Sequence, residues 1–338
     1  MRHPHGLRAA AGRSTFNPRE YFDVKLYTGN GSTQTISGLG FSPDLVWAKI
    51  RNTTGNHSLY DIVRGATQRL SSSTTNAEAT FTGSLTSFDS SGFSLGSNPD
   101  SDVNASGSTY AAWCWDAGSS TVTNTQGSIS SQVRANASAG FSIATLTTPA
   151  SGTFTVGHSL NVAPDLVICK ARNASFGWIV YHRSAGAGNL LVLNSTAASA
   201  ASTTVWQNTN PSSTIVFGDV TNWGTADYVM YSFAPVAGYS SFGSYTGNGS
   251  ATGPVISGLG FQPYFVMIKA SSRTGDWWMY DAVRSVANPR TNTLKANLSA
   301  SEDTAGEDID FQSDGFQIKN TDTGLNESAA TYIYAAFA

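Results

Sequence analysis

The chain has 338 residues, of which 19 are Lys or Arg and 22 are Asp or Glu, giving a formal net charge of -3. This balance excludes the basic field that nucleic-acid binding needs, and no apolar run approaches the ~18 residues of a membrane-spanning helix. Hydrophobic residues make up 40% of the chain and charged residues only 12%, which excludes a disordered chain. A low-charge sequence rich in Ser, Thr, Gly and aromatic residues favours an all-β fold with many turns.

The first 26 residues form a basic segment without hydrophobic periodicity. Its arginines are Arg2, Arg8, Arg13 and Arg19, with prolines and glycines between them. Such a segment has no apolar face to bury, and Pro and Gly oppose a continuous helix. The sequence therefore predicts an extended N-terminal docking arm over residues 1–26 that becomes ordered against a neighbouring protein or a sister subunit. The alternative is an arm that packs back onto its own first domain.

An internal repeat organises the rest of the chain. The sequence YTGNG at residues 27–31 recurs at 245–249, and SGLGF at 37–41 recurs at 257–261. A weaker middle copy has the sequence APDLV at 163–167, which matches SPDLV at 42–46 in four of five residues. Every copy ends with an aromatic strand. Copies of roughly 100 residues have the size of a small β-sandwich.

The repeat predicts three tandem antiparallel β-sandwich domains, concanavalin-like or jelly-roll-like, over residues 27–118, 141–237 and 238–338. The segment 119–140 is rich in Ser, Thr, Asn and Gly, which predicts a linker or an exposed loop. The run at 45–50 is apolar except for Lys49, as in a strand that is buried on both faces. Helix signals are sparse, so little helix is expected.

Together these motifs resemble a repeat domain of bacteriophage virion proteins that is common in marine and cyanobacterial phages. The resemblance rests on the sequences at 27–31 and 38–47, on Tyr60-Asp61 with residues 63–66, and on the closing strand at 110–115. It covers roughly residues 20–338, and the middle copy departs from it because Tyr181-His182 replaces the Tyr-Asp pair. The resemblance implies a lectin-like sandwich of concanavalin or SPRY type in a tail-fibre-like or particle-surface protein, without catalytic residues.

Enzymatic chemistry finds little support among the residues. Nucleophilic catalysis needs a Ser or Cys beside a His base, and no serine has the spacing of a nucleophile elbow. His57 aligns with Trp178 and Trp277, so its position does not require an imidazole. Asp308 and Asp310 belong to an acidic, loop-like segment, which leaves paired carboxylates for glycan hydrolysis as a minor alternative.

Metal and thiol chemistry is equally sparse. Asp100, Asp102 and Asn104 have the alternate spacing of a cation loop, but the glycine and the closing glutamate of an EF-hand are missing, so they are only a weak cation candidate. No Cys/His cluster exists for zinc, and no cofactor is expected. Cys114 and Cys169 lie in apolar runs and are expected to be buried thiols.

Four tryptophans are the candidates for glycan contact, because exposed aromatic faces can stack on sugars. Trp206 and Trp223 lie in polar segments. Trp277 and Trp278 are adjacent in a predicted strand, so one of them must face away from its own core. That side chain meets a neighbouring domain, another subunit or a ligand.

These observations predict a non-enzymatic structural protein on the surface of a phage particle, of tail-fibre or adhesin type, that attaches to a host-surface glycan. No heptad or β-helix stalk precedes the repeats, which favours in part the alternative of a capsid-decoration or assembly protein without a receptor role. A polysaccharide depolymerase is a minor alternative. Expected partners are other virion proteins, further copies of the chain in a homo-oligomer and the host glycan, with no nucleic acid and no membrane insertion.

The start of the chain bears on where the protein is made. No hydrophobic signal-peptide core follows Met1. We therefore expect synthesis in the host cytoplasm, release by a route such as cell lysis, and a final place on the virion.

Overall fold

The computed structural model describes residues 16–97, 102–207, 210–219, 225–306 and 308–338. Within these residues the fold is all-β and antiparallel. The described helices are η1 (Pro18–Glu20), η2 (Arg183–Ala185) and α1 (Thr323–Asn326), none longer than four residues. The prediction of an all-β chain with little helix is therefore confirmed. No helix among these residues is long and apolar enough to span a membrane.

Three large sheets repeat one strand order, which recurs as β1-β9-β3-β4, β12-β19-β14-β15 and β20-β27-β22-β23. The first comprises β1 (Phe22–Thr28), β9 (Thr109–Trp115), β3 (Leu45–Ile50) and β4 (Ser58–Asp61). The second comprises β12 (Phe141–Thr147), β19 (Asp227–Phe233), β14 (Leu166–Ala171) and β15 (Ile179–His182), continued by β16 (Asn189–Val192) and β17 (Ala200–Ala201). The third comprises β20 (Ser240–Thr246), β27 (Thr331–Phe337), β22 (Phe265–Ala270) and β23 (Trp277–Asp281), continued by β24 (Leu294–Lys295).

A small sheet packs on the outer face of each large sheet through a separate apolar cluster. The small sheets are β2 (Gln34–Ser37), β8 (Gly92–Leu95) and β7 (Leu85–Asp89); β13 (Phe154–Gly157) and β18 (Thr214–Phe217); and β21 (Val255–Ser257), β26 (Gly315–Ile318) and β25 (Ile309–Gln312). A short antiparallel pair, β5 (Gln68–Arg69) and β6 (Ala79–Thr80), lies between β4 and β7 in the chain. We call each large sheet with its small sheet a lobe: lobe 1 runs from β1 to β9, lobe 2 from β10 (Thr121–Asn124) to β19, and lobe 3 from β20 to β27.

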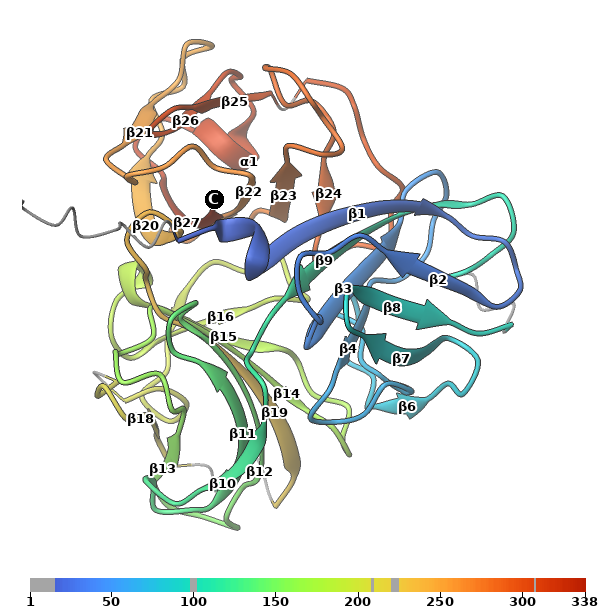
Figure 1. Cartoon of the computed structure of the whole chain (residues 1–338). Coiled ribbons are helices and arrows are strands. Elements are labelled where there is room, and N and C mark those ends of the chain that lie inside the picture. The colour runs from blue at the N-terminus through green and yellow to red at the C-terminus, as the bar shows by residue number, and fades with distance from the viewer. Residues whose placement is uncertain (1–15, 98–101, 208–209, 220–224, 307) are drawn as a thin grey trace, which may run out of the picture.

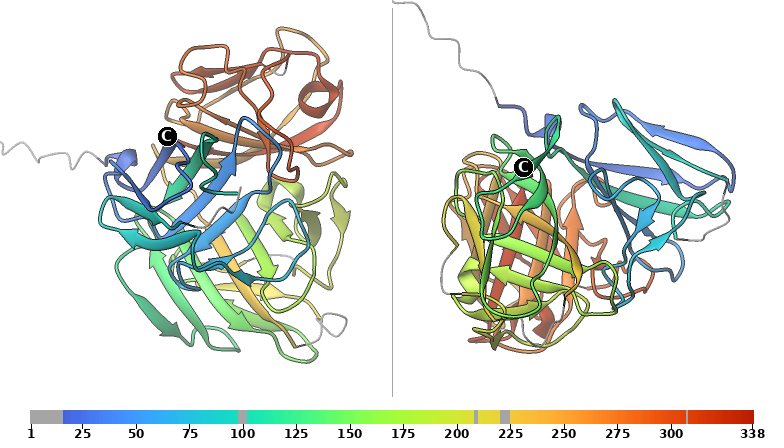
Figure 2. Two further views of the ribbon diagram at one scale, coloured as in Figure 1. Left: turned by 90° about the vertical axis from the view of Figure 1, so that its right-hand side faces the viewer. Right: turned by 90° about the horizontal axis from the view of Figure 1, so that it is seen from below.

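The inner faces of the three large sheets pack against one another in a single apolar cluster (Figures 1 and 2). Side chains alternate between the two faces of a strand, so in β3 Trp47 joins this shared core while Val46 joins the outer cluster of lobe 1. Every residue of β3 is buried, which confirms the prediction for 45–50. Because the lobes share their largest core, none of them buries its inner face alone.

The predicted linker over 119–140 contains two strands, β10 (Thr121–Asn124) and β11 (Ser131–Asn136). They form a hairpin, and β11 pairs with β12 along the edge of the second sheet. Polar residues alternate with the buried Val133 in β11, as in a strand with one covered face. This segment is therefore a paired part of lobe 2 and differs from the unpaired connection that its composition predicts.

The last part of the predicted arm belongs to the folded body. Residues 22–26 lie in β1, and Phe16 stacks on Tyr21 with ring centroids 4.8 Å apart. The guanidinium of Arg19 lies 3.1 Å from the ring centroid of Tyr264 in lobe 3. Arg19 thus contacts its own chain. Arg2, Arg8 and Arg13 lie outside the described residues.

Candidate functional site

The lobes meet at three equivalent junctions that form a closed cycle, lobe 1 to 2, 2 to 3 and 3 to 1. Each junction begins at the last residue of a large-sheet strand, where Asp61, His182 and Asp281 occupy matching positions. Each continues in a backbone hydrogen bond from Glu78, Ser199 or Glu302 to the carbonyl of Arg172, Ser271 or Arg51 of the next lobe, at 2.7–2.8 Å. The backbone geometry is therefore repeated even where the side chains change.

At junction 1–2 a fully buried ion pair of lobe 1 is contacted by side chains of lobe 2. Arg64 Nε donates to Asp61 Oδ2 at 2.5 Å, and both side chains are inaccessible to solvent. Tyr231 of lobe 2 donates its hydroxyl to the same carboxylate oxygen at 2.7 Å. Glu78 then accepts from Arg64 at 2.8 Å and pairs with Arg172 of lobe 2 at 2.8 Å. Such a pair holds its partners in one geometry, because a buried charge cannot be left alone.

Junction 3–1 repeats this network with one exchange of partner. Arg284 Nε donates to Asp281 Oδ2 at 2.5 Å. The indole of Trp113 in lobe 1 donates to that oxygen at 3.1 Å, in the place of a tyrosine hydroxyl. Glu302 pairs with Arg284 at 3.1 Å and with Arg51 of lobe 1 at 2.7 Å.

Junction 2–3 is closed without a buried ion pair of this kind among the described residues. His182 Nδ1 accepts from the backbone N–H of Ser184 at 3.2 Å, so Nε2 carries the proton and donates to the carbonyl of Tyr334 at 3.0 Å. Burial lowers the pKa of His182 to about 4, an effect opposed only in part by the hydrogen bond to Tyr334. The imidazole is therefore neutral at pH 7, and no carboxylate among the described residues is its partner.

A second set of contacts explains the aligned position of His57, Trp178 and Trp277. Trp178 Nε1 donates to the carbonyl of Ser71 at 2.7 Å, and Trp277 Nε1 donates to that of Val192 at 3.0 Å. His57 Nδ1 accepts from Trp47 at 2.8 Å, so its Nε2 donates to the carbonyl of Lys295 at 3.0 Å. Each ring spans one junction, and the position requires a ring N–H donor of either type.

Three buried lysines occupy matching positions in the large sheets. Lys49, Lys170 and Lys269 are fully buried, and each ammonium donates to the carbonyl of the next residue at 2.7–2.8 Å. Burial lowers the pKa of each lysine to about 8. None of the three side chains opens onto a pocket described here, so we assign them to the structure of the junctions.

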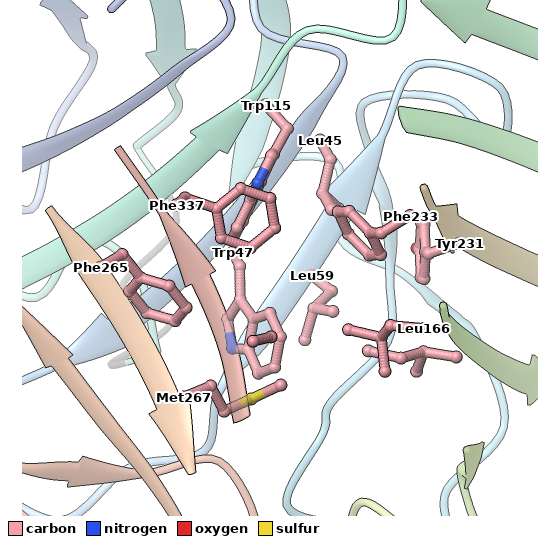
Figure 3. A pocket seen from close by; sticks show the side chains of 12 residues that line it. Leu45, Trp47, Leu59, Trp115, Leu166, Tyr231, Phe233, Phe265, Met267 and Phe337 are labelled. Carbon is pink, nitrogen blue, oxygen red and sulfur yellow. The ribbon is translucent and has the colours of Figure 1, made fainter. Parts of the chain in front are cut away.

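The centre of the shared core holds a small apolar cavity (Figure 3). Its volume is about 20 Å³, close to the space of one water molecule. Its walls are large apolar side chains from all three lobes, among them Trp47, Phe233 and Phe337. A cavity this small without polar partners stays dry, and it offers no room for a ligand.

A wide depression of about 630 Å³ lies between lobe 1 and the hairpin of lobe 2 and is lined in part by polar groups. Asp116 and Asn136 meet there, with Asn136 Nδ2 donating to Asp116 Oδ2 at 2.6 Å. Arg134 and Phe41 also line the depression. Carboxylate, amide and guanidinium groups beside one aromatic edge are the groups with which proteins hold sugar hydroxyls.

Three of the four tryptophans predicted for glycan contact are buried. Trp206 is inaccessible to solvent and donates to the carbonyl of Val180 at 3.2 Å. Trp278 packs in the outer cluster of lobe 3, whereas Trp277 faces the shared core and the junction with lobe 2. A ring that stacks on a sugar must be exposed, so these three do not fit that role. Trp223 lies outside the described residues.

Two residues of the weak cation candidate, Asp102 and Asn104, make hydrogen bonds or ion pairs within the fold. Asp102 Oδ2 pairs with Arg69 at 2.8 Å. Asn104 is buried and holds the turn of residues 29–34, with its side chain accepting from Asn30 N at 3.1 Å and donating to Ser32 O at 2.7 Å. Asp100 lies outside the described residues. In the described part of the chain no group of three His, Cys, Asp or Glu side chains is placed to hold a metal ion.

The class that these features define is an all-β protein in which repeated sheets are interlocked around one core. Residues 17–338 match the family model of a domain of unknown function, DUF7483. The chain therefore belongs to the DUF7483 family. No curated protein and no solved structure matches it.

Sequence reasoning missed the junctions, although their signal was present. The recurrence of Tyr60-Asp61 and Arg64 as Tyr280-Asp281 and Arg284 marks a repeated structural element. The repeated motif does not indicate that the carboxylate of one copy accepts a hydrogen bond from a ring of another copy. This contact depends on how the three lobes pack together.

Proposed function

We propose that this protein is a non-enzymatic structural component of the surface of a phage particle, built from three copies of one lectin-like β-sandwich unit. The sequence resemblance to virion repeat domains supports the proposal. The observation that carries it is the cyclic interlocking of the lobes, which uses the buried charged residues and ring donors to hold one rigid body. A rigid body of this kind is suited to display on a particle.

We further propose that it serves as a tail-fibre or adhesin component, and that the depression around Asp116 and Asn136 contacts a host-surface glycan. These side chains are half-buried and so are held in place before a ligand arrives. Preorganised polar groups lose little conformational entropy on binding. The proposed partners also include other virion proteins and further copies of the chain.

A glycan array probed with the soluble protein tests the adhesin role. Binding should be saturable and should fall at least roughly tenfold in Asn136→Ala, which loses a sugar-directed amide. Gln132→Ala is the matched control, because Gln132 is an exposed amide on the same strand and bonds to Thr123. Equal loss in both variants, or no binding to any glycan of host type, contradicts the adhesin role.

The alternative is a capsid-decoration or assembly protein without a receptor role. The shared core favours it, because one compact body suits a subunit clamped onto a shell. Electron microscopy of intact particles separates the two, since an adhesin lies at the tail and a decoration subunit lies on the capsid.

The non-enzymatic assignment is tested with host polysaccharide. His57, His158 and His182 are buried, and burial lowers the pKa of each. Incubation of the protein with the polysaccharide should release no reducing ends. Release that disappears in Asp308→Asn or Asp310→Asn would instead establish a depolymerase.

A further inference from the structure

A groove on the surface of lobe 2 is lined entirely by residues of that lobe. Its volume is about 400 Å³, within the range of small-ligand sites. One wall is formed by residues 122–126, at the end of β10, and the other by Ser159 and Asn161 in the turn after β13, which lies beside the hairpin in Figure 1. Within the described residues, the sheets of lobes 1 and 3 have no strand in the place of β10. We call this opening the amide groove, after the carboxamide side chains that line it.

The turn after β13 carries side chains where the other two lobes have glycine. Residues 159–162 are SLNV, whereas lobes 1 and 3 have GLGF at the matching positions. Ser159 and Asn161 have φ angles of 59° and 61°, in the same left-handed region as Gly258 and Gly260, at 83° and 80°. Glycine is the residue that adopts this region without strain. Lobe 2 therefore keeps the backbone of the glycine turn and adds two polar side chains to it.

A third polar side chain, that of Asn124, holds the two walls together. It is 6% exposed, and its Nδ2 donates to Ser159 Oγ at 2.7 Å and to Gln126 Oε1 at 3.1 Å. Its Oδ1 accepts from the backbone N–H of Gln126 at 2.8 Å. The amide lies so close to Gly157 that a Cβ there would fall 2.0 Å from Oδ1. The end of the hairpin is thus fixed to the turn, and the groove keeps its shape before a ligand arrives.

The lining groups are neutral and have hydrogen-bonding capacity left over. The Ser159 hydroxyl accepts from Asn124 and keeps its own hydrogen for another acceptor. The side-chain nitrogen of Gln126 and the whole amide of the exposed Asn161 have no hydrogen-bond partner within the described residues. Beside these groups Val122 is 51% exposed. The groove therefore offers donors, acceptors and one apolar contact.

This lining selects the chemistry of a ligand. Carboxamides both donate and accept hydrogen bonds, and so do the hydroxyl and acetamido groups of an N-acetylated sugar. The isopropyl group of Val122 suits the acetyl methyl of such a sugar. A charged sugar would lose hydration without gaining a counter-ion, because every residue that lines the groove is neutral.

We propose that the amide groove is a second carbohydrate site, which takes a neutral N-acetylated sugar. Asn161 and Gln126 bond to its acetamido group, and Ser159 bonds to a ring hydroxyl. The site shares no residue with the depression around Asp116 and Asn136. Binding in the groove therefore does not depend on whether the depression contacts a host glycan.

Titration of the full-length protein with N-acetylglucosamine, followed by the NMR shifts of the backbone amides, tests the site. The shifts should saturate and should concentrate in residues 122–126 and 159–161. Glucose and glucuronate should bind at least roughly tenfold more weakly, because the first lacks the acetamido group and the second is charged. The absence of saturable shifts, or equal affinity for either of these sugars, overturns the proposal. Shifts confined to residues 134–137 also overturn it, and would place the sugar in the depression instead.

Asn161→Gly is the sharpest variant, because it restores the glycine of lobes 1 and 3. It should leave the melting temperature unchanged or higher, since glycine adopts a positive φ without strain. It should weaken the binding of N-acetylglucosamine at least roughly tenfold, and Gln126→Ala should weaken it as well. Gln132→Ala is the matched control, because Gln132 is an exposed amide of the same hairpin that does not line the groove. Full affinity in Asn161→Gly, or an equal loss in the control, overturns the proposal.

Discussion

At junctions 1–2 and 3–1 a ring donor of one lobe bonds to a buried Asp–Arg pair of the other, whereas junction 2–3 uses a neutral histidine on a backbone carbonyl. The backbone hydrogen bonds that accompany them are the same at all three. The backbone hydrogen bonds and the ring N–H donors are therefore common to all three junctions. The buried ion pair occurs at two of them, and a neutral side chain can take its place. It also predicts that the junctions respond differently to mutation and to pH.

The largest effect is expected from Arg64→Met at junction 1–2. The variant leaves the fully buried Asp61 carboxylate without its cation, and breaking a buried pair in this way costs about 3–5 kcal/mol. Denaturant unfolding with linear extrapolation measures the change. Arg183→Met is the matched control, because this arginine of the corresponding turn is 70% exposed and its loss should stay within about 0.5 kcal/mol. A cost for Arg64→Met as small as that of the control would contradict the structural role of the ion pair.

Junction 2–3 should weaken in acid through His182. The pKa of His182 is lowered to about 4 in the folded state, against about 6.5 in the unfolded chain. The unfolded state therefore binds more protons between these values, so this contribution to stability is complete above pH 6.5 and is lost as the pH falls towards 4. The loss is on the order of 3 kcal/mol.

Comparison of the wild type with His182→Asn isolates this contribution. Burial raises the pKa of Asp44 to about 7, and a raised carboxyl pKa acts with the opposite sign, adding stability as the pH falls from 7 towards 4. The difference between the two proteins removes that shared background. The free energy of unfolding at pH 7 and at pH 4.5 is the measurement. A wild-type-minus-variant difference that does not change between these pH values would show that His182 is not buried neutral.

The smallest effect concerns the ring donors shared by all junctions. Trp178→Phe removes the indole N–H that reaches the carbonyl of Ser71, and the loss of this partly buried hydrogen bond costs about 1 kcal/mol. Trp115→Phe is the control, because Trp115 lies in the same core and its Nε1 has no hydrogen-bond partner in the described structure. Thermal or denaturant unfolding should therefore show the larger loss for Trp178→Phe; equal losses would assign both to packing alone.

The local strands could be predicted from the sequence because their pattern is local. The continuous apolar run of β3 indicates two covered faces, and the structure covers one with a small sheet and the other with neighbouring lobes. Because Trp277 and Trp278 are adjacent in a strand, their side chains point to opposite faces of the sheet. Trp277 faces the shared core and the junction with lobe 2. Period-two arguments of this kind need no knowledge of distant contacts.

The failures concern segments whose environment is set by distant parts of the chain. Trp206 is followed by the polar Gln207, which favours an exposed ring, yet the ring of Phe217 packs 5.1 Å away and the carbonyl of Val180 accepts the indole N–H. The hairpin over 119–140 has a composition typical of linkers, and only the open edge of β12 gives it a partner. The depression at Asp116 and Asn136 likewise forms where lobe 1 meets that hairpin, and no motif in the sequence marks it.

The placement of β27 has a consequence for synthesis. Phe337 packs against Phe22, Trp115 and Phe233 at ring-centroid distances of 5.4–6.0 Å, so the shared core gains a central side chain from a strand that leaves the ribosome after more than three hundred other residues. Until then the apolar inner faces of lobes 1 and 2 have no complete cover. Contacts of such long sequence separation slow folding and expose nascent chains to aggregation. The closed cycle therefore leaves the apolar inner faces of lobes 1 and 2 exposed on the nascent chain until β27 has been synthesised.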